Sequence, residues 1–163
     1  MGKKRTAYSE DVMDIVTLVE LAMTGYFAWQ VLFAGAEVKL TIPYLAGLGI
    51  GFHMDGFRAV YTFLTALAWF LTACFSKEYL KGEHHTNRYR MFFQFTLAAT
   101  TGVFMANNLY TMFMFFEIMS FVSFPLVIQE ETPEAKEAGM SYFAVAVIGG
   151  LLILMGIVLV YSQ

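Results

Sequence analysis

Charged residues are scarce in this sequence, and their scarcity excludes an ordinary soluble domain. Only 14% of the 163 residues are charged, against about 25% in a typical soluble domain. Residues 59–76 and 138–163 carry no charge, and residues 91–129 carry only Glu117. An apolar helix needs about 20 residues to cross a hydrocarbon core of about 30 Å. Three such windows in a short chain predict an integral membrane protein that lies in a lipid bilayer.

Cysteine and the common cofactor motifs are also nearly absent. The single cysteine, Cys74, lies in an apolar run and has no internal disulfide partner, so we expect it to pack between helices. The sequence has no P-loop, dinucleotide-binding glycine pattern, haem motif or iron–sulfur cysteine set. His84 and His85 stand in a polar loop with few further ligand types nearby. We therefore expect no metal and no cofactor, and we place any redox reaction on another chain.

The apolar runs predict about five transmembrane helices in one membrane domain, an all-α bundle. Asp55 is a suitable N-cap for the second helix, and Asn107 and Asn108 form a turn after the third. We expect residues 36–53, which are apolar and rich in glycine, to lie against the membrane surface or to re-enter it slightly. The predicted helices are residues 12–35, 55–80, 91–106, 109–128 and 138–160.

The basic residues predict the orientation of these helices. With five spans and a cytoplasmic N-terminus, two basic residues, Lys39 and Arg58, lie outside. The other eight lie inside: Lys3, Lys4, Arg5, Lys77, Lys81, Arg88, Arg90 and Lys136. Cytoplasmic loops of membrane proteins carry an excess of Lys and Arg. We therefore predict a multi-pass protein of the cell (inner or cytoplasmic) membrane with its N-terminus inside and its C-terminus outside. No basic patch indicates a nucleic-acid partner.

Glu117 is the strongest candidate for a functional residue. It is the ninth residue of the fourth predicted helix, which places it roughly 12 Å along the helix axis. On insertion scales, a charge at that depth costs about 2.5–3.5 kcal/mol. Protonation removes the charge, so this carboxyl group is suited to relay protons where water and a partner reach it. The alternative is a neutral Glu117 that only hydrogen-bonds a neighbouring helix.

Three residues near Glu117 fit such a pathway. Ser120 follows by three positions and therefore lies close to the same helix face. Ser123 is less well aligned. Pro125 lacks a backbone N–H and frees the carbonyl group of Phe121, which needs a partner in a membrane. This break is either a hydrated gating feature of an ion path or a simple kink.

Further charges lie nearer the membrane surfaces. Glu20 lies about two turns into the first helix, towards the cytoplasm, and is a second relay candidate, although snorkelling or pairing with a partner subunit is also open. Asp14 is shallower, and we expect an interfacial charge there. Asp55 and Arg58 are three residues apart, where opposite charges can pair, so we expect a structural pair at the outer mouth of the second helix.

The stretch 107–139 resembles a known family of membrane subunits. It contains the motifs FEIMS at 116–120 and SFPLV at 123–127, and a matching MDGF motif stands at 54–57. These motifs resemble the antiporter-like subunits shared by respiratory complex I, multisubunit monovalent cation/proton antiporters and membrane-bound energy-converting hydrogenases. Residues 132–135 look most like the D-type branch of the antiporters.

The resemblance implies a role and a missing partner. It implies that Glu117 is the family's essential helix glutamate, which pairs with a lysine on a later helix. Family members have many more helices, and this sequence has no intramembrane lysine to pair with Glu117. We expect a shortened, split-type member in which a partner chain supplies the lysine-bearing helices. The family's N-terminus lies outside, and loss of one leading helix reconciles this with the cytoplasmic N-terminus predicted here.

Two functions remain open on the sequence. The first is a non-catalytic subunit of a large ion-translocating complex, of hydrogenase, complex I or antiporter type, with a relay for protons or sodium centred on Glu117. The second is a structural or assembly subunit of such a complex with no pumping role. A basic residue placed near Glu117 by a neighbouring chain distinguishes the first from the second.

Overall fold

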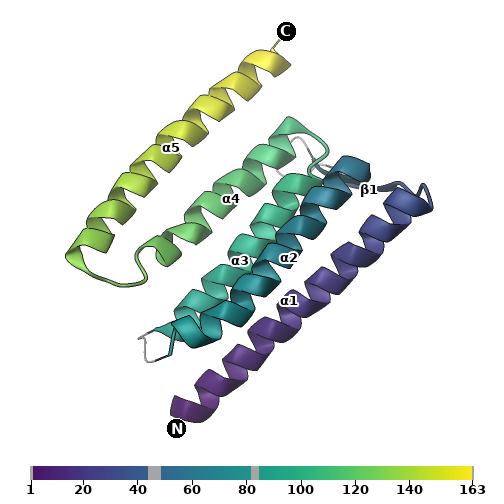
Figure 1. Cartoon of the computed structure of the whole chain (residues 1–163). Coiled ribbons are helices and arrows are strands. Elements are labelled where there is room, and N and C mark those ends of the chain that lie inside the picture. Colours follow the sequence, from purple (N-terminus) through teal and green to yellow (C-terminus); the bar gives the residue numbers. More distant parts are fainter. Residues whose placement is uncertain (1, 44–48, 82–84, 163) are drawn as a thin grey trace.

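The computed structural model of the chain describes residues 2–43, 49–81 and 85–162, with the backbone alone for residues 2–10. Within these residues it is a helical bundle with one small β-hairpin (Figure 1), and the predicted all-α membrane class is confirmed. Successive helices run in opposite directions, so α1 begins and α5 ends at opposite ends of the bundle. The elements are α1 (Gly2–Phe33), β1 (Val38–Ile42), β2 (Ile50–Met54), α2 (Gly56–Tyr79), α3 (Thr86–Met105), α4 (Leu109–Val127) and α5 (Pro133–Tyr161).

Four helices of the described chain are long and apolar enough to span a membrane. They are the Asp11–Phe33 part of α1, and α2, α4 and α5. The more polar α3 has 20 residues, which at 1.5 Å per residue gives about 30 Å, the thickness of a hydrocarbon core. It packs against α2, α4 and α1, and its Gln94 side chain donates to the Met13 carbonyl group of α1 at 3.0 Å. The surrounding helices thus accommodate the polar residues of α3.

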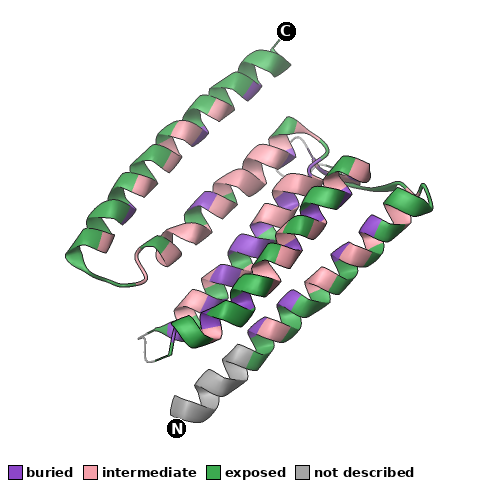
Figure 2. Ribbon diagram, in the orientation of Figure 1, coloured by how far each residue is buried: buried purple, intermediate pink, exposed green. Residues whose placement is uncertain are grey.

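The outer surface of the bundle is apolar, as expected for contact with lipid. Figure 2 shows exposed residues along α5 and along the outer side of α1, and Val145 and Leu152 of α5 are 70% and 68% exposed. Cys74 is also exposed, on α2, so the expectation that it packs between helices is wrong for the described helices.

Small side chains fill the interior of the bundle. Ala59, Ala66 and Ala73 recur every seven residues along α2 and are almost fully buried. Apolar surface gains little from leaving lipid for another apolar environment, so helices associate in membranes through close van der Waals packing, which small residues permit. The alanines thus form the face of α2 at which neighbouring helices approach.

Three helices begin earlier than predicted. The start of α5 moves from residue 138 to Pro133, because Thr132 caps the helix by accepting from the Ala135 N–H at 3.1 Å and proline suits the first helical position. The start of α3 moves from residue 91 to Thr86, and this added turn contains Arg90, which is buried in the bundle. The helical backbone of α1 extends to Gly2, ahead of its apolar span.

Residues 38–42 and 50–54 form a β-hairpin in the segment expected to lie against the membrane surface or to re-enter it. Strands β1 and β2 pair antiparallel, from Val38 opposite Met54 to Ile42 opposite Ile50. Gly51 holds the hairpin to the turn between α3 and α4: its N–H donates to Thr111 Oγ1 at 3.0 Å, and its carbonyl accepts from the Asn107 N–H at 2.8 Å. The hairpin is therefore fixed at one end of the bundle.

The contact between α3 and α4 depends on the absence of a side chain at Gly102. A Cβ atom there would lie 2.6 Å from Cγ and from Cε1 of the Phe115 ring. We predict that Gly102→Ala lowers the free energy of unfolding by about 1–3 kcal/mol, the usual cost of overpacking. Gly156→Ala on α5, where a Cβ meets nothing within 4 Å, is the control. Thermal unfolding of the full chain in lipid nanodiscs measures both, and equal stabilities would contradict this packing.

Candidate functional site

Glu117 lies near the middle of α4 and turns its carboxyl group towards α5. It stands eight residues after Leu109 and ten before Val127, about 12 Å and 15 Å along the helix. A Cβ atom at Gly150 of α5 would lie 2.6 Å from Glu117 Cδ and 2.8 Å from Oε2. Only the hydrogen of a glycine leaves room for the carboxyl group at this point.

One oxygen of this carboxyl group is buried without a partner. Glu117 Oε1 is sealed from solvent, and none of the described residues hydrogen-bonds it. None of the ion pairs among the described residues involves Glu117 either. A buried polar atom without a hydrogen bond costs about 1–3 kcal/mol. The geometry thus leaves a place for a proton or for a donor from outside the described residues.

Ser120 and Ser123 lie on the Val127 side of Glu117. Ser120 Oγ donates to the Phe116 carbonyl group of its own helix at 3.0 Å. Ser123 Oγ lies 2.6 Å from Tyr142 Oη on α5, and both of these hydroxyls lie within hydrogen-bond distance of the Ser120 carbonyl group, at 3.1 Å and 3.3 Å. The predicted polar neighbour, Ser120, is therefore joined to α5 through its backbone.

Pro125 lies in the last turn of α4, which stays helical to Val127. It stands eight residues beyond Glu117, about 12 Å along the axis, and close to the loop that leads to α5. A gating role for Pro125 remains a prediction.

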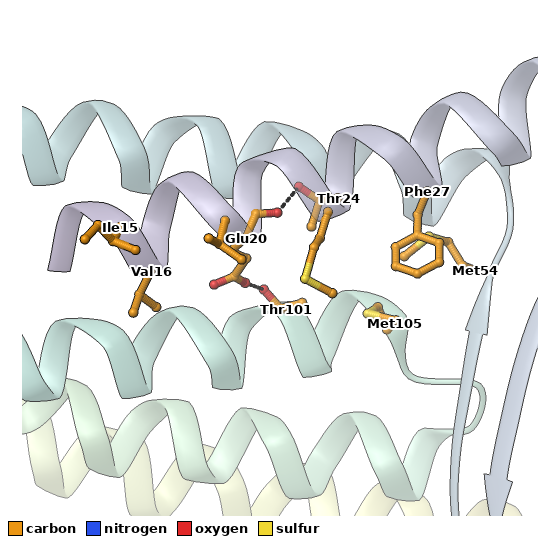
Figure 3. A pocket seen from close by; sticks show the side chains of 10 residues that line it. Ile15, Val16, Glu20, Thr24, Phe27, Met54, Thr101 and Met105 are labelled. Atoms are coloured by element: carbon orange, nitrogen blue, oxygen red, sulfur yellow. Dashed lines mark hydrogen bonds between the residues drawn. The ribbon is translucent and has the colours of Figure 1, made fainter. Parts of the chain in front are cut away.

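Glu20 provides a second carboxyl group at depth, on the opposite side of the bundle. It lies nine residues after Asp11 in the apolar span of α1, about 13 Å along the axis. Its Oε1 accepts a hydrogen bond from Thr101 Oγ1 of α3 at 2.8 Å (Figure 3). A cavity of about 470 Å³ lies beside it, lined by apolar residues of α1 and α3 and reaching Met54 of β2.

The two acids lie at similar depth. Gly102 of α3 contacts Phe115 of α4. Thr101 is one residue from Gly102 on α3, and Glu117 is two residues from Phe115 on α4. Each therefore lies within about 3 Å of that contact along its helix axis. Because Glu20 bonds Thr101, it lies at about the same level as Glu117, with α3 and α4 between them.

The remaining charged candidates pair at the ends of the bundle. Asp55 caps α2 by accepting from the Arg58 N–H at 2.9 Å, and it also forms an ion pair with the Arg58 side chain. The backbone hydrogen bond from Arg58 is the main cause that lowers the pKa of Asp55. Asp14 of α1 pairs with Lys77 of α2. In the described residues no group of three or more His, Cys, Asp or Glu side chains could hold a metal ion, and His84 lies outside those residues.

Sequence reasoning missed Tyr142 and Gly150, although α5 contains a usable signal. Tyr142, Ala146 and Gly150 are spaced by four residues on a helix otherwise rich in Leu, Ile and Val. Residues four apart share a helix face, so this spacing indicates the face of α5 that packs closely against α4.

Comparisons with known proteins agree with this architecture. The profile of the family described as "NADH:quinone oxidoreductase/Mrp antiporter, TM" matches residues 106–163. A Staphylococcus saprophyticus protein whose name assigns it as antiporter subunit mnhA2 is 27% identical over 153 residues, which are 90% of this chain and 19% of the relative. A Staphylococcus aureus protein named as antiporter subunit mnhD2 is 30% identical over 155 residues, 92% of this chain and 29% of the relative.

A solved structure shows the same fold. A chain of the membrane-bound sulfane sulfur reductase, described as an archaeal respiratory membrane complex, superposes with a TM-score of 0.84 and 26% identity. The match covers 94% of this chain and 31% of that chain. The chain thus spans 19% to 31% of the length of these relatives.

Fold and sequence together define the class. The chain is a multi-pass helical membrane protein with two carboxylic acids at depth in its bundle. Its sequence and fold are similar to those of antiporter-like membrane subunits, which confirms the resemblance that its motifs predicted.

Adjacent glycines on α5 offer a matched test of the Glu117 site. Gly150→Ala places a Cβ against the Glu117 carboxyl group, whereas a Cβ at Gly149 meets nothing within 4 Å. We predict that Gly150→Ala lowers the free energy of unfolding by about 1–3 kcal/mol, that Gly149→Ala does not, and that the shorter Glu117→Asp side chain partly restores the Gly150→Ala variant. Denaturation in lipid nanodiscs measures all three, and a Gly150→Ala variant as stable as Gly149→Ala would place the carboxyl group elsewhere.

Proposed function

We propose that this chain is an antiporter-like subunit of a multisubunit ion-translocating membrane assembly and that Glu117 takes up and releases protons at mid-membrane. The observation that carries the proposal is the Glu117 carboxyl group itself. It is packed against Gly150 at the centre of a span, and its Oε1 is buried without a hydrogen-bond partner among the described residues. Membrane-embedded acids are rare and expensive, and they commonly mark ion pathways and proton relays.

Packing alone accounts poorly for a carboxyl group at this position. An amide of the same size fills the same space without a titratable group. The carboxyl group differs from it in one respect, because it exists with and without a proton.

Two features support a role for residues beyond Glu117. Ser120 and its bonded neighbours Ser123 and Tyr142 place hydroxyl groups on one side of the acid. Glu20 lies at the same level and is bonded to Thr101. We propose Ser120 as a polar neighbour of the relay and Glu20 as a companion acid beside the cavity between α1 and α3. Pro125 is proposed to break the hydrogen-bond ladder of α4 where the path nears the loop before α5.

The partner of Glu117 is proposed to lie outside residues 1–163. A basic side chain from the rest of the assembly would compensate the ionised form of Glu117, whose Oε1 is unpaired within the described residues. The names of the relatives refer to antiporter subunits and to a respiratory membrane complex, which supports an assembly of several membrane subunits. Protons are the ion that a single carboxyl group handles directly, and sodium movement would be linked to them elsewhere.

A structural or assembly subunit is the second candidate. The observation in its favour is that the Ser120 hydroxyl bonds its own helix at Phe116. On this account Glu117 would remain protonated and serve only the contact between α4 and α5.

The substitution Glu117→Gln separates these two functions. Glutamine is nearly the same size but cannot bind and release a proton, so we predict an assembled complex with ion transport reduced by roughly 10²-fold or more, the range for removing a proton-transferring side chain. Glu117→Asp should keep partial activity. The measurement is ion uptake by the reconstituted assembly, normalised to its assembled amount.

The control is Glu137→Gln, an exposed acid near the start of α5. This variant changes the same chemical group away from the contact between α4 and α5, so the assembly should transport ions at the wild-type rate. Wild-type transport by Glu117→Gln would exclude a relay at this residue and favour the structural subunit.

The proposed orientation has a separate test. The hairpin, with Lys39, and the Lys81 turn lie at opposite ends of α2, and the excess of basic residues supports a cytoplasmic location for the Lys81 side. In a background in which the exposed Cys74 is replaced by Ser, we predict that Lys81→Cys reacts with an impermeant thiol reagent only from the cytoplasmic side and Lys39→Cys only from outside. The reverse pattern in sealed vesicles of known orientation would invert the proposed topology.

A further inference from the structure

Two hydroxyl groups face each other across the contact between α4 and α5. Ser123 Oγ of α4 and Tyr142 Oη of α5 are 2.6 Å apart, and either atom can be the donor. Ser123 Oγ lies 3.1 Å from the Ser120 carbonyl oxygen, and Tyr142 Oη lies 3.3 Å from the same oxygen. The three groups form a closed polar cluster inside an apolar helix contact.

This cluster has two alternative hydrogen-bond arrangements. When Tyr142 donates to Ser123, the Ser123 hydroxyl donates to the Ser120 carbonyl group. When Ser123 donates to Tyr142, the Tyr142 hydroxyl donates to that carbonyl group instead. Each arrangement uses both O–H groups, so the cluster can reverse its direction without leaving a donor unpaired. A pair of hydroxyls that reverses in this way can pass protons repeatedly in one direction.

The cluster lies one to two helix turns from Glu117 along α4. Residues 117, 120 and 123 follow at steps of three along α4, each about 4.5 Å along the axis. A cavity of about 330 Å³ between α4 and α5 is lined by Ser120, Tyr142 and Gly149 among other residues. Gly149 precedes Gly150, against which the Glu117 carboxyl group packs. The space is open on one side and mostly apolar, and the hydroxyl groups of Ser120 and Tyr142 are the groups on it that can bind water.

We propose that Ser123 and Tyr142 form the proton inlet to Glu117 from the Val127 end of α4. This proposal rests on the proposed function of Glu117 and adds the residues through which its proton arrives. A hydronium ion on the Val127 side gives a proton to an oxygen of the pair and is left as water. The pair gives up its own proton to a cavity water towards Glu117, and that water passes one proton to the carboxylate and is neutral again. Each hydroxyl ends with one O–H bond as before, and the Glu117 carboxylate gains one. Release along the same path reverses these steps.

Tyr142 acts here through its hydroxyl group, because a phenylalanine would supply the same ring for packing. The next residue, Phe143, contacts the Phe121 and Phe124 rings of α4, so this contact already accepts phenylalanine side chains. A tyrosine at 142 adds only the oxygen that meets Ser123.

Infrared difference spectroscopy of the reconstituted assembly tests the inlet. The protonated Glu117 carboxyl group has a carbonyl stretch that Glu117→Gln removes, and transfer into D₂O shifts this band as the proton exchanges. We predict that Tyr142→Phe slows this exchange roughly tenfold, less than the 10²–10⁴-fold effect typical of a proton-transferring group, because a water can partly replace a hydroxyl. Ser123→Ala removes the other hydroxyl group of the pair and should slow the exchange similarly.

Two further comparisons identify the pair as one unit. The double variant should exchange no more slowly than the slower single variant, since residues that act together are not additive. Tyr161→Phe and Ser141→Ala, both exposed on α5, remove the same groups from lipid-facing positions and should exchange at the wild-type rate.

The outcomes separate this proposal from the proposed function. An exchanging Glu117 band whose rate is unchanged in both Tyr142→Phe and Ser123→Ala would overturn the inlet and leave Glu117 as the relay. A wild-type protein without any exchanging Glu117 band would overturn both.

Discussion

The contact between the Glu117 carboxyl group and the bare backbone at Gly150 determines how this part of the protein works. It brings α5 close enough to α4 for Tyr142 to meet Ser123, and it encloses Glu117 Oε1 without a hydrogen-bond partner among the described residues. A larger residue at 150 would separate the helices or displace the acid. The same absence of a side chain therefore fixes both the packing of α5 and the surroundings of the carboxyl group.

Close approach at small residues is the general solution for a bundle surrounded by lipid. Leaving lipid gives an apolar side chain little stabilisation, so contact area and shape decide which helices pair. Gly102 receives the Phe115 ring between α3 and α4, and the buried alanines of α2 have a similar role towards its neighbours. These contacts also set the relative depths of the helices, and they place Glu20 and Glu117 at one level on opposite sides of α3 and α4.

The two acids differ in how they are held. Glu20 accepts a hydrogen bond from Thr101 and borders a large cavity, whereas Glu117 is packed tightly with one oxygen unpaired. A bonded carboxyl group beside open volume suits a site that exchanges with its surroundings. A tightly packed one suits a site whose charge must be balanced by a specific partner.

Much of the fold follows from the sequence because the apolar runs are long and the charges between them are clustered. The class of protein, the five helices and the positions of Glu117 and Asp55 could be predicted in this way. What the sequence does not show is how α3, the most polar of the five helices, is accommodated: Gln94 bonds the Met13 carbonyl group of α1, and Thr101 bonds Glu20. The hairpin depends on contacts of Gly51 with residues 107 and 111, which are distant in the sequence.

The candidate site was predicted less completely than the fold. Glu117 could be identified by its depth, since a lone charge in a long apolar run is conspicuous. The spacing of Tyr142, Ala146 and Gly150 indicates a packing face of α5, but that this face meets Glu117 and Ser123 emerges only when α5 is placed against α4. The early start of α5 was missed for a simpler reason: the capping signal of Thr132 followed by Pro133 lies within a run of acids that resembles a loop.

The most direct test of the central claim is the protonation of Glu117 at equilibrium, followed by its carboxyl infrared band as pH is varied and compared with the pH dependence of ion transport by the same assembly. If Glu117 is the relay, the band should rise and fall within the pH range in which transport changes, and Glu117→Gln should abolish it. A band that stays constant throughout that range would show a carboxyl group fixed in one protonation state, which would contradict a proton relay at Glu117.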